Sequence, residues 1–328
     1  MKLRKNGRQI LYFCLILVLV LVVLYSGLRI LESTVLRSGT GQEAAYTRKT
    51  ITRGGVDYYP RQDITTVLVL GIDQSGPVAV SEGYMNRGAA DLVMLLVFDE
   101  SRQTCDILQL NRDTMLRMPV LGLGGRKAGT SYGQLALAHT YGTGLADSCE
   151  NIREAVSNFL YGITVDYYVS MRMDAIGLLN DAVGGVTVNV TEDFSQVDPT
   201  IGKGPVTLKG QQALSYVRTR QNLGDQLNIS RMERHRKYVD SFLAAFRAAR
   251  EEDPEFFLQT YETITPYLVT DCSVNTISGI IDRYGDYTVN TPVTPEGENV
   301  LGDQYYEFHA DEEKLDQLIL EMFFAPKK

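Results

Sequence analysis

The sequence predicts an α/β fold, a mixed α+β sandwich whose central sheet is largely antiparallel or mixed, flanked by helices and preceded by one transmembrane helix. Three observations support this prediction. They are an uncharged apolar run near the N-terminus, a group of short β-branched runs separated by turn residues, and amphipathic segments of helical length. These patterns continue to the C-terminus without a second linker, so we expect one folded domain at residues 63–328.

The apolar run covers residues 10–28 and contains no charged residue. About 20 apolar residues in a helix span the hydrocarbon core of a bilayer. Four basic residues and no acidic residue precede the run, so residues 1–9 are expected in the cytoplasm and the rest outside the membrane. A cleaved signal peptide is the alternative, but its apolar region is usually about 7–15 residues long and ends at a small-x-small site. The sequence favours an uncleaved, single-pass anchor in the cell membrane.

A polar segment at residues 29–62 has little periodic apolar pattern, and we interpret it as an extracytoplasmic stalk. The formal net charge of the chain is −8, although its first eight residues carry four positive charges and no negative ones. An acidic body of this kind argues against nucleic-acid binding. The short cytoplasmic tail cannot contain a helix-turn-helix.

Three runs rich in Val, Ile and Leu open the folded domain, at residues 65–72, 91–98 and 104–110. Turn residues separate them, and no segment of helical length lies between them. Because parallel neighbours need long crossover connections, the simplest topology is an antiparallel meander.

Helical and strand patterns alternate in the rest of the chain. We expect helices at residues 148–161, 173–183 and 311–323, and strands at residues 167–171, 185–190 and 213–220. A further long helix is predicted to open at Ser230, because Ser230 and Glu233 have the spacing of a capping box.

Two carboxylates and one guanidinium are placed together by the meander. Asp73 follows the first strand, Asp91 begins the second, and Arg112 follows the third. In an antiparallel meander these three positions lie along one rim of the sheet. Mg²⁺ is commonly held by one or two carboxylates together with substrate phosphates, and arginine binds phosphate oxygens through two parallel hydrogen bonds. The spacing therefore predicts metal-assisted handling of a phosphate-bearing substrate.

Further basic residues follow near the end of this region. Arg218 and Arg220 alternate onto one face of the predicted strand, where two like charges repel unless an anion lies between them. Arg231, Arg234 and His235 share one side of the next helix near its N-terminus, a position that favours anions.

Six motifs occur in the chain in a fixed order: Leu-Gly-Ile-Asp at 70–73, Arg to Asp-Leu-Val-Met at 87–94, Asn-Arg-Asp-Thr at 111–114, Asp-Ala-Val-Gly-Gly-Val at 181–186, Gly-Gln-Gln-Ala-Leu-Ser-Tyr-Val-Arg-Thr-Arg at 210–220 and Arg-Met-Glu-Arg at 231–234. In this order they resemble the successive signatures of the LytR-CpsA-Psr family. The resemblance covers residues 64–246, and an extension follows it. The sequence departs from the family pattern at Gln134, near the place where many members have a phosphate-binding lysine.

The resemblance implies an Mg²⁺-dependent (or Mn²⁺-dependent) phosphotransferase. Such an enzyme moves an anionic glycopolymer from a polyprenyl-pyrophosphate lipid in the membrane to peptidoglycan, through a phosphodiester bond. By this resemblance Asp73 and Asp91 hold the metal. We also predict that Arg112 and Asp113 are catalytic. The resemblance also implies that Arg112, Arg218, Arg220 and Arg231 bind the pyrophosphate, and the spacing on the helix adds Arg234 and His235 to this predicted set.

Several alternatives remain open at the level of sequence. The same residues suit a polyprenyl-pyrophosphate pyrophosphatase, in which water attacks, or a non-catalytic, lipid-binding regulator. Asp113 or Asp91 would serve as the base toward the attacking hydroxyl. The apolar stripe of Ile152, Val156, Phe159 and Leu160 forms either a wall of the family's lipid tunnel or ordinary core.

Cys105, Cys149 and Cys272 lie in the predicted extracytoplasmic domain. A bridge between Cys149 and Cys272 is one interpretation, and buried free thiols are the other. The three histidines have no metal-ligand spacing with the cysteines, which argues against a zinc site.

Overall fold

The computed structural model describes residues 50–83, 85–219, 223, 228–253, 255–273, 276, 279–280, 283–284 and 287–327. The predicted tail, the predicted membrane span at 10–28 and most of the predicted stalk lie outside these residues. Of the helices within the described ranges, none is both long and apolar enough to cross a bilayer. The transmembrane helix therefore stays a prediction.

The central sheet has six strands in the order β11-β8-β3-β4-β5-β12. Its middle is the predicted meander, in which β3 (Ile64–Ile72), β4 (Ala90–Asp99) and β5 (Thr104–Leu110) pair antiparallel. On one side β8 (Tyr167–Arg172) pairs parallel with β3, and β11 (Leu268–Thr270) pairs antiparallel with β8. On the other side β12 (Thr288–Val289) pairs parallel with β5. The sheet is mixed, as predicted.

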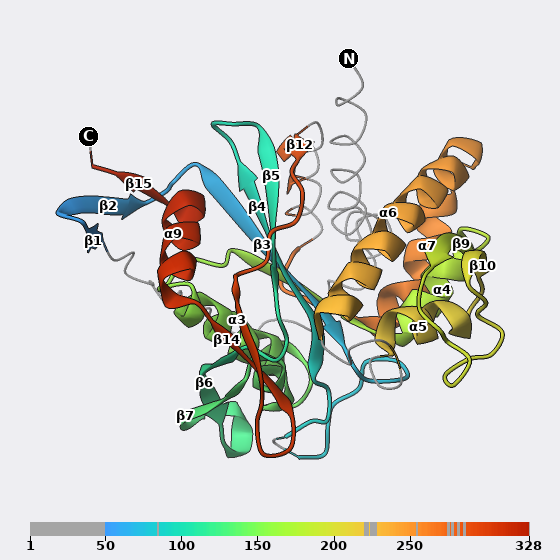
Figure 1. Ribbon diagram of the computed structural model, residues 1–328, viewed down its shortest axis with the longest axis horizontal. Helices are drawn as coiled ribbons and strands as arrows, with labels where there is room; N and C mark the ends of the chain where they lie inside the picture. The colour runs from blue at the N-terminus through green and yellow to red at the C-terminus, as the bar shows by residue number, and fades with distance from the viewer. Residues whose placement is uncertain are drawn as a thin grey trace, which may run out of the picture.

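Helices cover both faces of this sheet (Figure 1). On one side lie α3 (Ala146–Phe159) and α9 (Glu312–Phe323). On the other side lie α4 (Asp174–Ala182), α5 (Gln211–Arg218), α6 (Asn228–Glu252) and α7 (Phe256–Ile264). The predicted helices at 148–161, 173–183 and 311–323 are confirmed. Asp311 caps α9 through hydrogen bonds that it accepts from two backbone amides.

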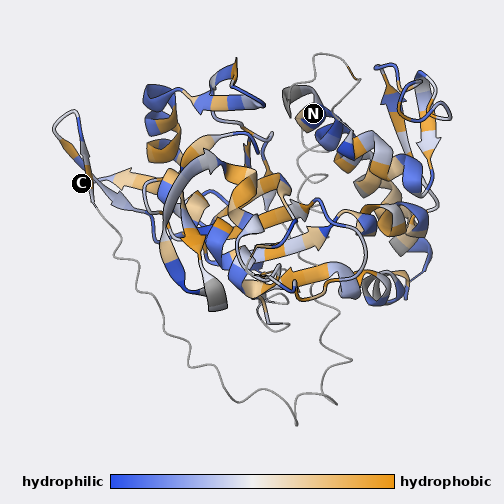
Figure 2. Cartoon of the chain, turned by 90° about the horizontal axis from the view of Figure 1, so that it is seen from below, coloured by the Kyte–Doolittle hydropathy of each residue, from blue (hydrophilic) through white to orange (hydrophobic). Residues whose placement is uncertain are grey.

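Two hydrophobic cores result, one on each face, because successive side chains of a strand point to opposite sides. In β3, Val67 and Val69 belong to the core under α4 to α7, whereas Leu68 and Leu70 belong to the core under α3 and α9. Figure 2 shows apolar residues concentrated on the central strands and polar residues on the outer surfaces of the helices.

The apolar stripe of α3 is part of the second core. Ile152, Val156 and Leu160 are fully buried there, together with residues of β3 and α9. The interpretation of this stripe as a tunnel wall is therefore wrong, and the alternative of ordinary core is confirmed.

Four small sheets surround the central one. A three-stranded sheet joins β1 (Ile51–Arg53), β2 (Val56–Pro60) and β15 (Phe324–Pro326). The others are hairpins: β6 (Met115–Leu121) with β7 (Lys127–Gln134), β9 (Val186–Val190) with β10 (Gly204–Leu208), and β13 (Gly297–Leu301) with β14 (Tyr306–Ala310). Short 3₁₀ helices follow at η2 (Leu123–Gly125), η3 (Leu135–Thr140) and η4 (Thr265–Tyr267). Residues 51–60 of the predicted stalk are thus part of the fold, because β1 pairs with β2 and β2 pairs with the C-terminal strand.

Two sequence predictions fail between residues 210 and 235. The segment predicted as a strand at 213–220 is the helix α5 up to Arg218, and Ala213, Leu214, Tyr216 and Val217 form its buried face. Helical spacing of these four residues outweighs the period-two pattern that the arginines suggested. The long helix α6 begins at Asn228, so Ser230 lies inside its first turn and not at the cap.

The cysteines in the described part of the chain are free and buried. Cys149 belongs to the core under α3, and Cys272 belongs to the core on the opposite face of the sheet, which keeps them apart. The free-thiol interpretation is confirmed. Burial raises the pKa of each of these two thiols to about 12, so neither forms a thiolate at neutral pH.

We therefore expect Cys105, Cys149 and Cys272 to resist a thiol reagent such as DTNB in the folded protein, and to react once the protein unfolds. The measurement is the number of reactive thiols with and without denaturant, in a chain with Cys14 replaced by serine. Rapid reaction of one or more thiols without denaturant would contradict the buried positions.

Candidate functional site

The three residues that the meander was expected to bring together do meet at one rim of the sheet. Asp73 follows β3, and its amide donates to the carbonyl of Ala89 just before β4 (2.8 Å). Nη1 of Arg112, after β5, lies 3.0 Å from Oδ1 of Asp91. The register shifts at Gly71 and Ile72, which marks a bulge at the end of β3 next to this rim.

Asp91 also pairs with Arg231 from α6. Nη1 of Arg231 donates to Oδ2 of Asp91 at 2.8 Å, and the side chains of the two residues are only 3% and 4% exposed. One buried carboxylate thus lies between two guanidinium groups, from β5 and from α6. This arrangement connects the N-terminal turns of α6 to the sheet.

Arg218 approaches the other carboxylate from the C-terminal end of α5. Its Nη2 lies 2.7 Å from Oδ1 of Asp73, and the two side chains are 48% and 33% exposed. Burial raises the pKa of Asp73, and the nearby carboxylate of Asp91 raises it further, whereas Arg218 lowers it. The side chains of Asp73 and Arg218 form the solvent-accessible part of the rim.

The donors at this rim suit a hard divalent cation. Asp73 and Asp91 repel each other, as the raised pKa of Asp73 indicates, and a cation between them would relieve that repulsion. Oδ1 of Asp91 is buried; Nη1 of Arg112 lies 3.0 Å from it, but no hydrogen bond of good geometry to a described residue satisfies it. The described residues contain no group of three or more His, Cys, Asp or Glu that could hold a metal. Two carboxylates would fit an ion such as Mg²⁺ only if water or substrate phosphates supplied its remaining ligands.

Arg234 and His235, predicted to bind pyrophosphate, are turned toward the end of α5. Nε of Arg234 donates to the carbonyl of Tyr216 (3.0 Å), and its Nη2 donates to the carbonyl of Thr219. Nε2 of His235 bonds to the carbonyl of Val217 at 2.8 Å. These are carbonyls that a helix leaves unsatisfied at its C-terminus. In this structure the two side chains therefore stabilise α5 and, through it, the position of Arg218.

His235 is fully enclosed, and burial lowers its pKa to about 3, with a smaller contribution from the charge of Arg231. The ring is thus neutral at physiological pH, and it cannot supply a positive charge to an anion. The hydrogen bonds of Arg234 and His235 to the end of α5 therefore do not support a role for these two residues in binding pyrophosphate.

Asp113 is buried beside Arg112, with 3.7 Å between Oδ1 of Asp113 and Nε of Arg112. Gln134 at the end of β7 donates to this Oδ1 at 3.1 Å and to the carbonyl of Tyr306 at 2.8 Å. Gln134 thus connects the loop after β5 to β14, a role that its place in the sequence did not reveal. Asp113 stays a predicted catalytic residue.

Arg172 was not found by sequence reasoning. It ends β8, directly beside Ile72 of β3. Its guanidinium donates to the carbonyls of residues 75, 76, 77 and 79, at 2.5 Å for Pro77. It therefore holds the loop that follows Asp73. The only signal in the sequence was an arginine directly after a predicted strand. Arg220, which was predicted to bind pyrophosphate together with Arg218, lies outside the described residues.

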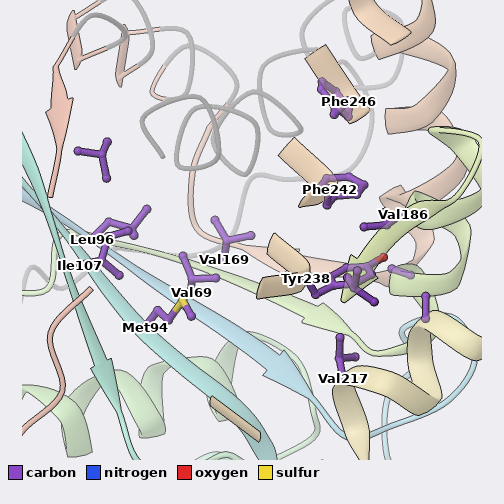
Figure 3. Packing of buried hydrophobic residues seen from close by; sticks show 14 of the residues in the cluster. Val69, Met94, Leu96, Ile107, Val169, Val186, Val217, Tyr238, Phe242 and Phe246 are labelled. Atoms are coloured by element: carbon purple, nitrogen blue, oxygen red, sulfur yellow. The ribbon is translucent and has the colours of Figure 1, made fainter. Parts of the chain in front are cut away.

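An almost entirely apolar cavity of about 110 Å³ lies between the sheet and the helices α4 to α7. Gly71 and Leu92, each close in sequence to a rim carboxylate, line it together with Val169, Tyr238 and Phe242. Figure 3 shows Val169 on the face of the sheet that Tyr238 and Phe242 of α6 approach. The apolar cavity therefore lies next to the charged rim.

Comparisons with known proteins agree with this architecture. A model of the LytR_cpsA_psr family matches residues 33–323. The polyisoprenyl-teichoic acid–peptidoglycan teichoic acid transferase TagU of Bacillus subtilis is 28% identical over 183 residues, which cover 56% of this chain and 52% of that protein. TagU of Enterococcus faecalis is 32% identical over 180 residues, 54% of this chain and 52% of the relative. The chain thus spans about half the length of these curated relatives.

Among solved structures, one of TagT bound to LI-WTA superposes with a TM-score of 0.58 at 23% identity, covering 80% of this chain and 90% of that one. At this identity the likeness shows a shared fold, and it confirms the predicted mixed α/β class.

Proposed function

The chain belongs to the LytR-CpsA-Psr family, and we propose that it transfers an anionic glycopolymer, of the teichoic acid or capsular polysaccharide type, from a polyprenyl-pyrophosphate carrier to peptidoglycan. One observation carries the proposal: a rim with three arginines opens beside an apolar cavity. This combination matches a ligand with an anionic head and a long apolar tail. The names of the relatives support the same activity.

In the proposed reaction a glycan hydroxyl attacks the phosphorus that bears the glycopolymer. A new P–O bond forms to the acceptor, and the bond to polyprenyl phosphate breaks, with its electron pair leaving on that phosphate. The hydroxyl proton passes to a base, for which Asp113 and Asp91 remain the candidates. Arg112 and Arg218 stabilise the charge that develops on the leaving phosphate, and Arg231 holds Asp91 in place.

We propose Asp73 and Asp91 as the ligands of Mg²⁺ or Mn²⁺. When bound, such an ion would neutralise phosphate charge and orient the pyrophosphate. The part of the polyprenyl chain nearest the pyrophosphate would enter the cavity beside Gly71 and Leu92, so that the pyrophosphate reaches the rim.

The transfer test uses the purified full-length chain, a labelled polyprenyl-pyrophosphate glycopolymer and peptidoglycan fragments. Labelled peptidoglycan together with released polyprenyl phosphate is the expected result. Release of polyprenyl phosphate without labelled peptidoglycan would identify a pyrophosphatase instead. Binding of the lipid with neither product would identify a lipid-binding protein.

Metal binding is expected to stabilise the protein through Asp73. At an Mg²⁺ concentration one hundred times the dissociation constant, the gain is about 2.7 kcal/mol, seen as a higher melting temperature. The Asp73→Asn variant should lose this gain, whereas Asp303→Asn, at an exposed position outside the site, should keep it. Because the pKa of Asp73 is raised, the effect should fade as the pH falls toward that pKa. An equal Mg²⁺ effect on wild type and Asp73→Asn would remove Asp73 as a ligand.

We also propose that residues 10–28 anchor the chain in the cell membrane with the domain outside. Alkaline phosphatase fused after residue 40 should be active, because that enzyme folds only outside the cytoplasm. A cytoplasmic reporter fused at the same position should be inactive. The opposite pair of results would reverse the orientation.

A further inference from the structure

A second cleft, of about 660 Å³, lies next to the rim and has both polar and apolar walls. Asn111, which directly precedes Arg112, forms one end of it. Its charged lining comes from Glu233 and Arg236 of α6, Glu296 and Glu298 around the start of β13, and Lys314 of α9. Apolar side chains, among them Met232 and Phe308, line it as well. The cleft therefore extends from the catalytic loop outward between α6 and the C-terminal hairpin, a part of the chain that the proposed donor site does not use.

The walls of this cleft are fixed by hydrogen bonds between elements that are distant in sequence. Nε of Arg236 donates to Oε1 of Gln109 in β5 (3.1 Å), and its Nη2 donates to Oγ1 of Thr294 (2.8 Å). The amide of Phe308 in β14 donates to the carbonyl of Asp113 at 2.9 Å. The hairpin is thus attached directly to the loop that carries Arg112, and the cleft is preformed.

The cleft has an excess of negative charge, although Lys314 pairs with Glu296 at its wall. Four carboxylates line it, from Glu233, Glu296, Glu298 and Asp311, against the two cations of Arg236 and Lys314. A polyanion in this cleft would face an excess of like charge, which costs binding energy. The cleft therefore disfavours the anionic donor polymer and suits an uncharged ligand with hydroxyl and amide groups.

We propose that this cleft binds the acceptor, as an uncharged stretch of N-acetylated sugars with one hydroxyl at the Asn111 end. The proposal rests on the proposed transfer function. The volume of the cleft lies within the range of about 300–1,000 Å³ that is typical of ligand sites, which is enough for a short oligosaccharide. The arginines of the rim would then hold the donor and the acidic cleft the acceptor, and the two would meet at residues 111–113.

The binding test uses the full-length chain in detergent and a tetramer of β-1,4-linked N-acetylglucosamine, measured by calorimetry. Glu233→Gln and Glu298→Gln should each weaken binding about tenfold, which corresponds to about 1.4 kcal/mol. Glu321→Gln, at an exposed position of α9 that does not line the cleft, is the matched control and should bind like wild type. Tetragalacturonate, an anionic tetramer of similar length, should bind more weakly than the neutral one.

A kinetic test separates the two proposals. In the transfer assay Glu233→Gln and Glu298→Gln should raise the KM for peptidoglycan fragments about tenfold and leave the KM for the lipid donor unchanged. Unaltered tetramer binding and acceptor KM in both variants, or tighter binding of the anionic tetramer, would overturn the acceptor cleft. A wild-type chain that binds the tetramer at the cleft but transfers no glycopolymer would count against the proposed function alone.

Discussion

Replacing Asp91 by asparagine is expected to lower the free energy of unfolding by about 3–5 kcal/mol, the cost of breaking a buried ion pair from one side. The substitution keeps the volume of the side chain but leaves the buried guanidinium of Arg231 without its counter-charge. Arg112 loses the same partner. Transfer activity should be lost as well, because Asp91 holds α6 against the rim. Denaturant unfolding and the transfer assay measure the two effects.

Asp73→Asn is the matched control for this loss of stability. Asp73 is partly exposed, and its raised pKa means that its ionised form costs folding energy above that pKa. Without metal, Asp73→Asn should therefore be as stable as wild type at neutral pH, or slightly more stable. In Asp91→Asn, a second substitution of Arg231 by Gln should recover part of the lost stability, since it removes the stranded charge. Wild-type stability of Asp91→Asn would show that the buried pair with Arg231 does not form.

The rim could be predicted from sequence because it depends on local pattern. Three apolar runs with short connections permit little besides a meander, and that topology alone places Asp73, Asp91 and Arg112 at one end of the sheet. Asp73 and Asp91 could therefore be proposed as metal ligands from the strand topology alone.

The basic residues were harder to place, because their directions depend on tertiary contacts. Arg231, Arg234 and His235 share one side of α6 by spacing, yet Arg231 reaches the sheet while the other two reach the end of α5. Which neighbour lies beside each turn of a helix is not encoded in the helix itself. Arg218 was assigned to a strand because two arginines alternate there, although four buried apolar residues have helical spacing.

Contacts of long sequence separation were not predicted at all. Gln134 donates to Asp113 and to the carbonyl of Tyr306, which lies 172 residues after Gln134 in the sequence. The pairing of β2 with the C-terminal β15 is equally remote, which explains why residues 51–60 were assigned to the stalk. The acidic cleft depends on the same C-terminal region, so it could be recognised only once the hairpin was seen against the loop at 111–114.

Arg218→Gln is expected to lower kcat/KM for transfer by about 10²–10³-fold, the range for removing one preorganised donor from a developing negative charge. Arg218 is the most exposed of the rim arginines that the structure describes, and its fork faces Asp73 at the open part of the rim. Its ion pair is half exposed, so the free energy of unfolding should change by no more than about 1 kcal/mol. Arg218→Lys should recover only part of the activity, because lysine keeps the charge but not the planar fork.

The matched control is Arg283→Gln, which removes an ion pair of similar exposure between Arg283 and Glu100 that takes no part in the rim. It should change stability as little as Arg218→Gln does and leave transfer unaltered. Measuring activity and unfolding on both variants therefore separates a phosphate ligand from a surface ion pair. If Arg218→Gln loses several kcal/mol of stability and retains donor affinity, Arg218 supports the fold and does not bind the substrate.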